Sequence, residues 1–83
     1  MSKRQKFFAY LSKKPTPSDV AFCDLESFCS GIGFNVSNRN GGSHYIFRYE
    51  DFVISVPNHG IVKQEYLRRI VQAIQEHDLS IEE

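Results

Sequence analysis

Two stretches of the chain carry apolar residues at the three- and four-residue steps of an amphipathic helix. The first starts at Ser18 or a little later, and its apolar positions are Phe22, Leu25, Phe28, Cys29 and Ile32. Gly31 and Gly33 follow it and supply a stop. The second has an apolar stripe, opposite a polar face, made of Tyr66, Leu67, Ile70, Val71 and Ile74. The pattern therefore predicts two helices that each bury one face.

Between these helices the pattern changes to the alternation of a β-strand. Phe34 and Val36 alternate with polar residues, and a polar, glycine-bearing turn follows at residues 38–42. Two further strands are predicted from His44 to Tyr49 and from Phe52 to Pro57. The order helix, three antiparallel strands, helix predicts an α+β fold, a two-layer sandwich with both helices on one face of the sheet.

The register of the second hairpin follows if Glu50 and Asp51 form a two-residue turn. The apolar face then consists of the pairs Tyr49 with Phe52, Phe47 with Ile54, and Tyr45 with Val56. The opposite, open face carries His44, Ile46, Arg48, Val53, Ser55 and Pro57, with Asn35, Ser37 and Arg39 from the first strand. A slip by one residue would bury His44 and Arg48 and expose the aromatic residues, so the first register is preferred.

Residues 1–17 are predicted to be a basic N-terminal appendage to a main domain formed by residues 18–83. Pro15 and Pro17 break any helix begun earlier, and the apolar residues of the segment predict a short helix packed on the main body. The formal net charge of the chain is zero, with ten Lys and Arg against ten Asp and Glu. This total hides a basic start and an acidic tail, for which solvated chain ends are the simplest explanation.

Composition narrows the classes of protein. No apolar run is long enough to span a membrane, and the start lacks the features of a signal peptide, so we expect a cytoplasmic protein with no membrane partner. Cys23 and Cys29 have a spacing that neither faces them toward each other nor matches paired zinc ligands. We expect reduced, semi-buried thiols, no metal and no cofactor.

Candidate chemistry gathers at one end of the predicted sheet. The register places Gly42 opposite His59, so His44 and His59 converge where the loop 57–62 leads into the last helix. An imidazole exchanges protons near neutral pH, so His44 is a candidate general base or acid, with an ordinary exposed strand residue as the alternative. His59, between Asn58 and Gly60, also suits a loop or cap residue.

Basic residues of the chain are candidates for binding RNA phosphates. They are Arg39, Arg48 and Lys63, to which the N-terminal lysines could be added, and a solvated surface is the alternative. The free N–H groups at the start of the last helix could also attract a phosphate. A Ser or Cys triad finds no support, and a metal site little more, because Asp51, the nearest acid in the hairpin, lies at its far end. His77 is most simply a favourable charge at a helix C-terminus.

The chain resembles the HicA family of toxin-antitoxin toxins over residues 18 to 78. The resemblance rests on Gly33-Phe34, Gly42-Ser43-His44-Tyr45-Ile46-Phe47, Ile54-Ser55-Val56-Pro57-Asn58-His59, Val62-Lys63 and Tyr66 to Ile74. Its most specific part is Gly-Ser-His, followed at fixed distance by a strand that ends in Pro and by a second His. Residues 1–14 exceed the short core of the family.

The resemblance implies a fold like a double-stranded-RNA-binding domain and the activity of a metal-independent endoribonuclease, an mRNA interferase that arrests translation. The implied partners are the mRNA substrate and a HicB-type antitoxin protein that covers the active site. The catalytic histidine of the family corresponds to His44, Gly42 and Ser43 match its flanking positions, and His59 matches the second histidine. The alternative is a non-catalytic module of the same fold that binds RNA or a protein without cleaving RNA.

Overall fold

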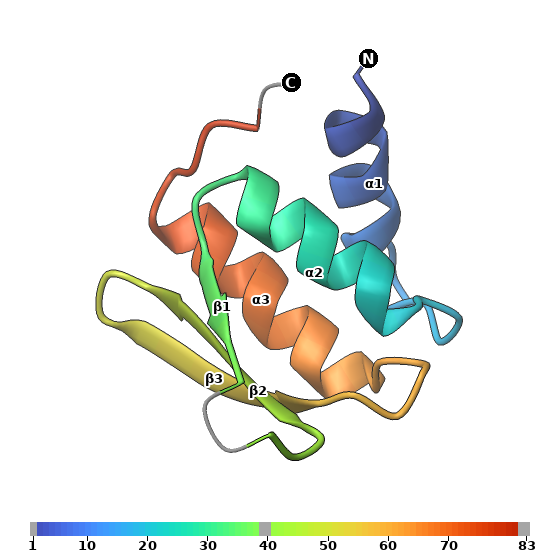
Figure 1. Cartoon of the computed structure of the whole chain (residues 1–83). Coiled ribbons are helices and arrows are strands. Elements are labelled where there is room, and N and C mark those ends of the chain that lie inside the picture. Colours follow the sequence, from blue (N-terminus) through green and yellow to red (C-terminus); the bar gives the residue numbers. More distant parts are fainter. Residues whose placement is uncertain (1, 39–40, 82–83) are drawn as a thin grey trace.

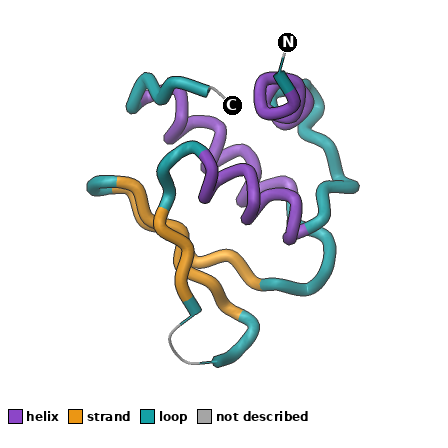
Figure 2. Tube along the Cα trace, turned by 45° about the horizontal axis from the view of Figure 1, so that its top comes forward, coloured by secondary structure: helices purple, strands orange, loops and turns teal. Residues whose placement is uncertain are grey.

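The computed structural model of the 83-residue chain describes residues 2–38 and 41–81. Its helices are α1 (Lys3–Leu11), α2 (Phe22–Gly31) and α3 (Gln64–Glu76), and its strands are β1 (Asn35–Ser37), β2 (His44–Tyr49) and β3 (Phe52–Pro57). The strands form one antiparallel sheet in the order β1-β2-β3. Figures 1 and 2 show α2 and α3 on the same side of this sheet, with α1 on the side of these helices away from it. The predicted α+β fold with a short N-terminal helix is confirmed.

The register predicted for the second hairpin is also confirmed. Tyr45 pairs with Val56, Phe47 with Ile54 and Tyr49 with Phe52. The side chains of this face are buried or partly buried against the helices, and Phe47 at its centre is 0% exposed. The open face carries the exposed residues Asn35, His44, Arg48, Val53 and Ser55. Alternation along each strand thus determines which side chains solvent can reach.

The start of α2 is determined by contacts with a distant segment. Residues 20–22 run antiparallel to residues 60–62, with the N–H of Phe22 donating to the carbonyl of Gly60 at 2.8 Å and the N–H of Val62 donating to that of Val20 at 2.9 Å. The residue before the helix, Ala21, has no polar side chain to cap the first turn. The helix therefore begins at Phe22, where this pairing turns the chain into the helical layer.

Both core helices end in the same hydrogen-bonded motif. At the end of α2, the N–H of Phe34 donates to the carbonyl of Cys29 at 2.9 Å, and Gly33 between them has φ of +116°. At the end of α3, the N–H of Leu79 donates to the carbonyl of Ile74 at 3.1 Å. This Schellman arrangement needs a left-handed residue just after the helix. Gly31 and Gly33 were predicted as the stop; the structure confirms Gly33 in that role, whereas Gly31 is the last residue of α2. Because the motif includes Phe34, β1 begins one residue later, at Asn35.

The equivalent left-handed position after α3 is occupied by Asp78, with φ of +52°. Replacing Asp78 by Gly is expected to raise the free energy of unfolding by about 0.5–1 kcal/mol, because Gly adopts this backbone conformation without a steric cost. Urea denaturation followed by circular dichroism measures the change. Asp78→Ala is the matched control, since it removes the same carboxylate and keeps the strained conformation. Equal stabilisation by both substitutions would assign the effect to the charge near the helix C-terminus.

Helix α1 packs on the helical layer through aromatic contacts. The ring centroids of Phe7 and Phe28 are 5.1 Å apart, and Leu11 is 1% exposed within the same buried cluster as the core of the sheet. The segment between α1 and α2 is held at two points: the hydroxyl of Tyr10 donates to Asp19, and the side-chain amide of Gln64 donates to the carbonyl of Thr16. Within residues 2–38 and 41–81, no helix is long and apolar enough to cross a membrane.

The two cysteines of α2 have different environments. Cys23 is exposed and Cys29 is buried, so the expectation of two semi-buried thiols is wrong. The spacing of six places them on different sides of the helix, one toward solvent and one toward the core. Burial raises the pKa of the Cys29 thiol far above its usual value, which leaves it in the unreactive protonated form.

We expect only one thiol of the native chain to react rapidly with Ellman's reagent, because the thiolate is the attacking species. The second should react once the chain is unfolded in denaturant. In Cys23→Ser the rapid phase should disappear and the slow thiol should remain. A rapid phase that persists in this variant would contradict the burial of Cys29.

Candidate functional site

His44 is the first residue of β2 and lies on the open face of the sheet. It pairs with Pro57, and its side chain is exposed. One residue before it, the carbonyl of Ser43 accepts a hydrogen bond of 2.6 Å from the N–H of Asn58, so the pairing continues beyond the end of β3. The carbonyl of Gly42 accepts a hydrogen bond of 2.8 Å from the side-chain amide of Asn38. These hydrogen bonds hold the backbone next to His44 in place.

The loop after β3 is tied down on both sides. Its start is bonded to Ser43, and its end is bonded through Gly60 to the first residue of α2. Gly60 has φ of +91°, and its N–H donates to the side-chain oxygen of Asn58 at 3.4 Å. His59 is the exposed residue between these anchors. His44 and His59 therefore lie on neighbouring segments at one end of the hairpin, and in the described part of the chain neither imidazole has a hydrogen bond or an ion pair.

The predicted phosphate-binding residues do not form one cluster. Arg48 is exposed on the same face as His44, but four residues along a strand correspond to about 13 Å. An extended RNA strand would thus meet Arg48 at a different phosphate from the one at His44. Lys63 is the exposed residue that precedes α3, and its side chain makes no capping hydrogen bond. Glu65 stands in the first turn of that helix. Arg39 lies outside the described residues.

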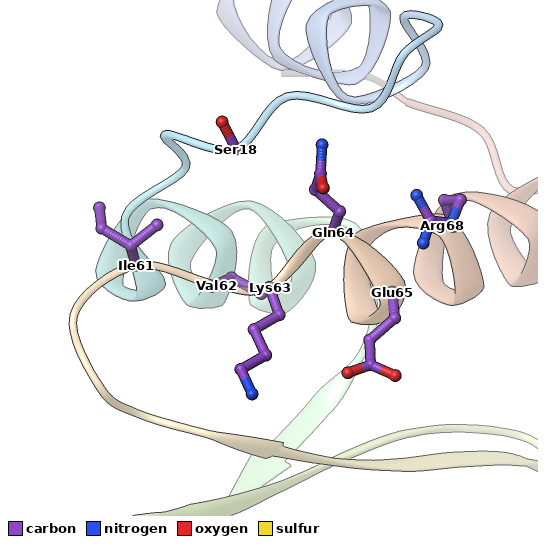
Figure 3. Close-up of a pocket in the computed structure, with 7 residues that line it drawn as sticks. All are labelled: Ser18, Ile61, Val62, Lys63, Gln64, Glu65 and Arg68. Atoms are coloured by element: carbon purple, nitrogen blue, oxygen red, sulfur yellow. The ribbon is translucent and has the colours of Figure 1, made fainter.

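A groove of about 500 Å³ opens beside the start of α3 (Figure 3). Of the predicted site residues that the structure describes, only Lys63 lines it, together with Ser18, Ile61, Val62, Gln64, Glu65 and Arg68. Figure 3 shows that Gln64 and Arg68 extend to one side of the chain, whereas Lys63 and Glu65 extend to the other. No sequence pattern pointed to Ser18 or Gln64, because only folding brings them to the same groove. His44 and His59 are not among its lining residues.

The third histidine, His77, belongs to the opposite end of the hairpin. It follows α3, its ring packs edge-on against that of Tyr49 at 5.3 Å, and its Nε2 lies 3.5 Å from a carboxylate oxygen of Asp51. A protonated His77 thus has an ion-pair partner in the β2–β3 turn in addition to the C-terminus of its own helix. As predicted, Asp51 is at the far end of the hairpin from His44.

Among the residues that the structure describes, no three His, Cys, Asp or Glu side chains are grouped as ligands for a metal ion. Comparisons of the chain with protein-family models, with curated proteins and with solved structures found no match.

Proposed function

We propose that this chain is an endoribonuclease of the HicA type, a toxin that cuts mRNA and arrests translation. The observation that carries the proposal is the position of His44, which is exposed on a firmly bonded strand end directly after Gly42 and Ser43. The described residues of the open face include Arg48 and no carboxylate. A face without acids, carrying an imidazole and a cation, suits a phosphodiester substrate.

In the proposed mechanism the imidazole of His44 accepts the proton of an RNA 2′-hydroxyl. The 2′-oxygen attacks the adjacent phosphorus, and the bond from phosphorus to the 5′-oxygen breaks. The products are a 2′,3′-cyclic phosphate and a 5′-hydroxyl, and no metal takes part. His59 is the candidate acid that returns a proton to the leaving 5′-oxygen, because its loop is bonded beside Ser43. Lys63 is the candidate for easing the negative charge that develops on the phosphate.

The proposed partners are the mRNA substrate and a HicB-type antitoxin that covers the open face in the cytoplasm. Covering this face would block His44 without any change in the core, since the helices occupy only the other side of the sheet. An antitoxin bound there should protect His44 from chemical modification by diethyl pyrocarbonate.

Induced expression in bacteria tests the proposal. The wild-type chain should stop growth and shorten cellular mRNA, whereas His44→Ala should do neither. Ser55→Ala, on the same open face, is the matched control and should remain toxic. Equal toxicity of the wild type and His44→Ala would remove His44 from the chemistry.

A binding module of the same fold is the second candidate. It is favoured by one observation: the groove in Figure 3 lies beside the helical layer and neither His44 nor His59 lines it. If neither the wild type nor His44→Ala is toxic and cellular mRNA stays intact, the binding module is favoured.

A further inference from the structure

A second groove, of about 400 Å³, runs between α3 and the segment that joins α1 to α2. We call it the linker groove and define it by its three cations, Lys13, Lys14 and Arg68. Among the residues that the structure describes, no carboxylate lines the groove, and its other polar side chains include the amides of Gln72 and Gln75. This concentration of positive charge contrasts with the formal net charge of zero for the chain.

The walls of the linker groove are fixed by contacts on both sides. Leu11 is buried in the core at one end of the segment, and the carbonyl of Thr16 accepts a hydrogen bond from the side chain of Gln64 on α3. The Nζ of Lys13 lies 5.2 Å from the centre of the Tyr10 ring. The backbone that carries the two lysines is thus held in place before any ligand arrives, which lowers the entropic cost of binding.

Two acidic side chains accept hydrogen bonds from neutral donors, and neither lines the groove. Asp19 accepts the hydrogen bond from Tyr10, and Glu76 accepts one of 3.1 Å from Gln72. Within residues 2–38 and 41–81, no carboxylate forms an ion pair with Lys14 or Arg68. In that part of the chain these two cations have no ion-pair partner, so they can pair with an external anion.

Arg68 connects the linker groove to the groove at the start of α3, because it lines both. The groove at the start of α3 is also lined by Lys63, which follows the loop of His59 along the chain. Figure 3 shows Arg68 on the same side of α3 as Gln64, the residue bonded to the linker. Arg68 therefore stands at the border of the two grooves, whereas Lys63 and the carboxylate of Glu65 extend to the other side of the chain at the start of α3.

We propose that the linker groove binds phosphate groups of an RNA strand, at nucleotides distant from the one at His44. The inference rests on the proposed function in so far as it takes RNA as the ligand. A chain of phosphates matches the three cations of the linker groove, whereas a single small anion would meet only some of them. Residues 1–17 then have a function in holding the substrate, through Lys13 and Lys14.

The experiment measures binding of a fluorescein-labelled, single-stranded RNA by fluorescence anisotropy, with His44→Ala as the background so that cleavage does not interfere. The variant is Lys14→Gln with Arg68→Gln. Its matched control is Lys6→Gln with Arg69→Gln, which removes the same charge from exposed residues outside the groove. Titrations cover salt from about 50 to about 200 mM, and circular dichroism verifies that each variant is folded.

The groove variant should bind RNA about threefold to tenfold more weakly at low salt, and the control should bind nearly as the background does. The slope of log affinity against log salt should fall by about 0.7 for each phosphate contact removed. Equal weakening by both variants would overturn the proposal, because it would indicate only long-range attraction. Absence of RNA binding would overturn it too.

Two further results distinguish this proposal from the proposed ribonuclease activity and from binding of an acidic protein. RNA binding that depends on the groove, together with an absence of cleavage by the wild type, would support the linker groove while refuting the proposed ribonuclease. If the groove variant instead loses binding to poly-L-glutamate and keeps its affinity for RNA, the groove is a docking surface for an acidic protein, and the RNA proposal fails.

Discussion

Replacing His44 by alanine should lower the rate at which the purified chain cleaves RNA by about 10²- to 10⁴-fold, the usual contribution of one general acid–base group. The side chain is exposed and has no hydrogen bond in the described part of the chain, so the free energy of unfolding should change by less than about 0.5 kcal/mol. Single-turnover cleavage of an end-labelled RNA, in buffer containing EDTA, measures the rate. Urea denaturation of the same proteins measures the free energy of unfolding.

Two substitutions serve as controls for this result. Ser55→Ala changes an exposed residue of the same face and should leave the rate unaltered. His59→Ala determines whether the neighbouring loop supplies the second proton: a loss comparable with that of His44→Ala would make His59 catalytic, whereas a small change would limit it to binding. If His44→Ala cleaves RNA within a few-fold of the wild-type rate, the proposed mechanism is wrong.

Replacing Phe47 by alanine should lower the free energy of unfolding by about 3–5 kcal/mol. Phe47 is in the central strand, is 0% exposed and packs edge-on against Phe22 of α2, with ring centroids 5.8 Å apart. Its removal leaves a cavity where sheet and helix meet. Small domains are stabilised by only about 0.05–0.15 kcal/mol per residue, so this loss removes a large part of the stability of the chain.

Urea denaturation followed by circular dichroism measures this loss, and the hairpin provides a matched control. Val53 is on the opposite face and is 41% exposed, so Val53→Ala should cost less than about 1 kcal/mol. Similar losses for the two substitutions would contradict the assignment of one buried and one open face. Phe47→Leu should fall between them, because it retains part of the buried volume.

The neutral formal charge of the chain does not argue against an RNA substrate once the positions of the charges are considered. Lys14 and Arg68 lie in the linker groove without a carboxylate partner among the described residues, whereas Glu50 and Asp51 stand beside His77 at the far end of the hairpin. The basic linker groove and this acidic turn are therefore separate groups of charge. Recognition of a polyanion depends on the local field at such a site more than on the net charge.

The sequence by itself determined the order of the elements and the two faces of the sheet. Once Glu50 and Asp51 form a two-residue turn, the residues of β2 and β3 that pair are determined by their distance from the turn. Alternation along β2 then assigns His44 to the open face. Gly33 marked the end of α2 because the Schellman motif requires a left-handed residue there. These features depend on neighbours along the chain, which a local pattern records.

The tertiary structure alone decided which distant residues meet. Pairing of residues 20–22 with 60–62 fixes the loop of His59, packing of the linker on α3 brings Lys14 into one groove with Arg68, and the hairpin turn supplies Asp51 to His77. Exposed polar side chains leave no periodic signal of their partners, because their positions are set by how the buried faces pack together. The sequence therefore predicted the strand end that carries His44, and only folding revealed the basic groove proposed to hold the rest of the RNA.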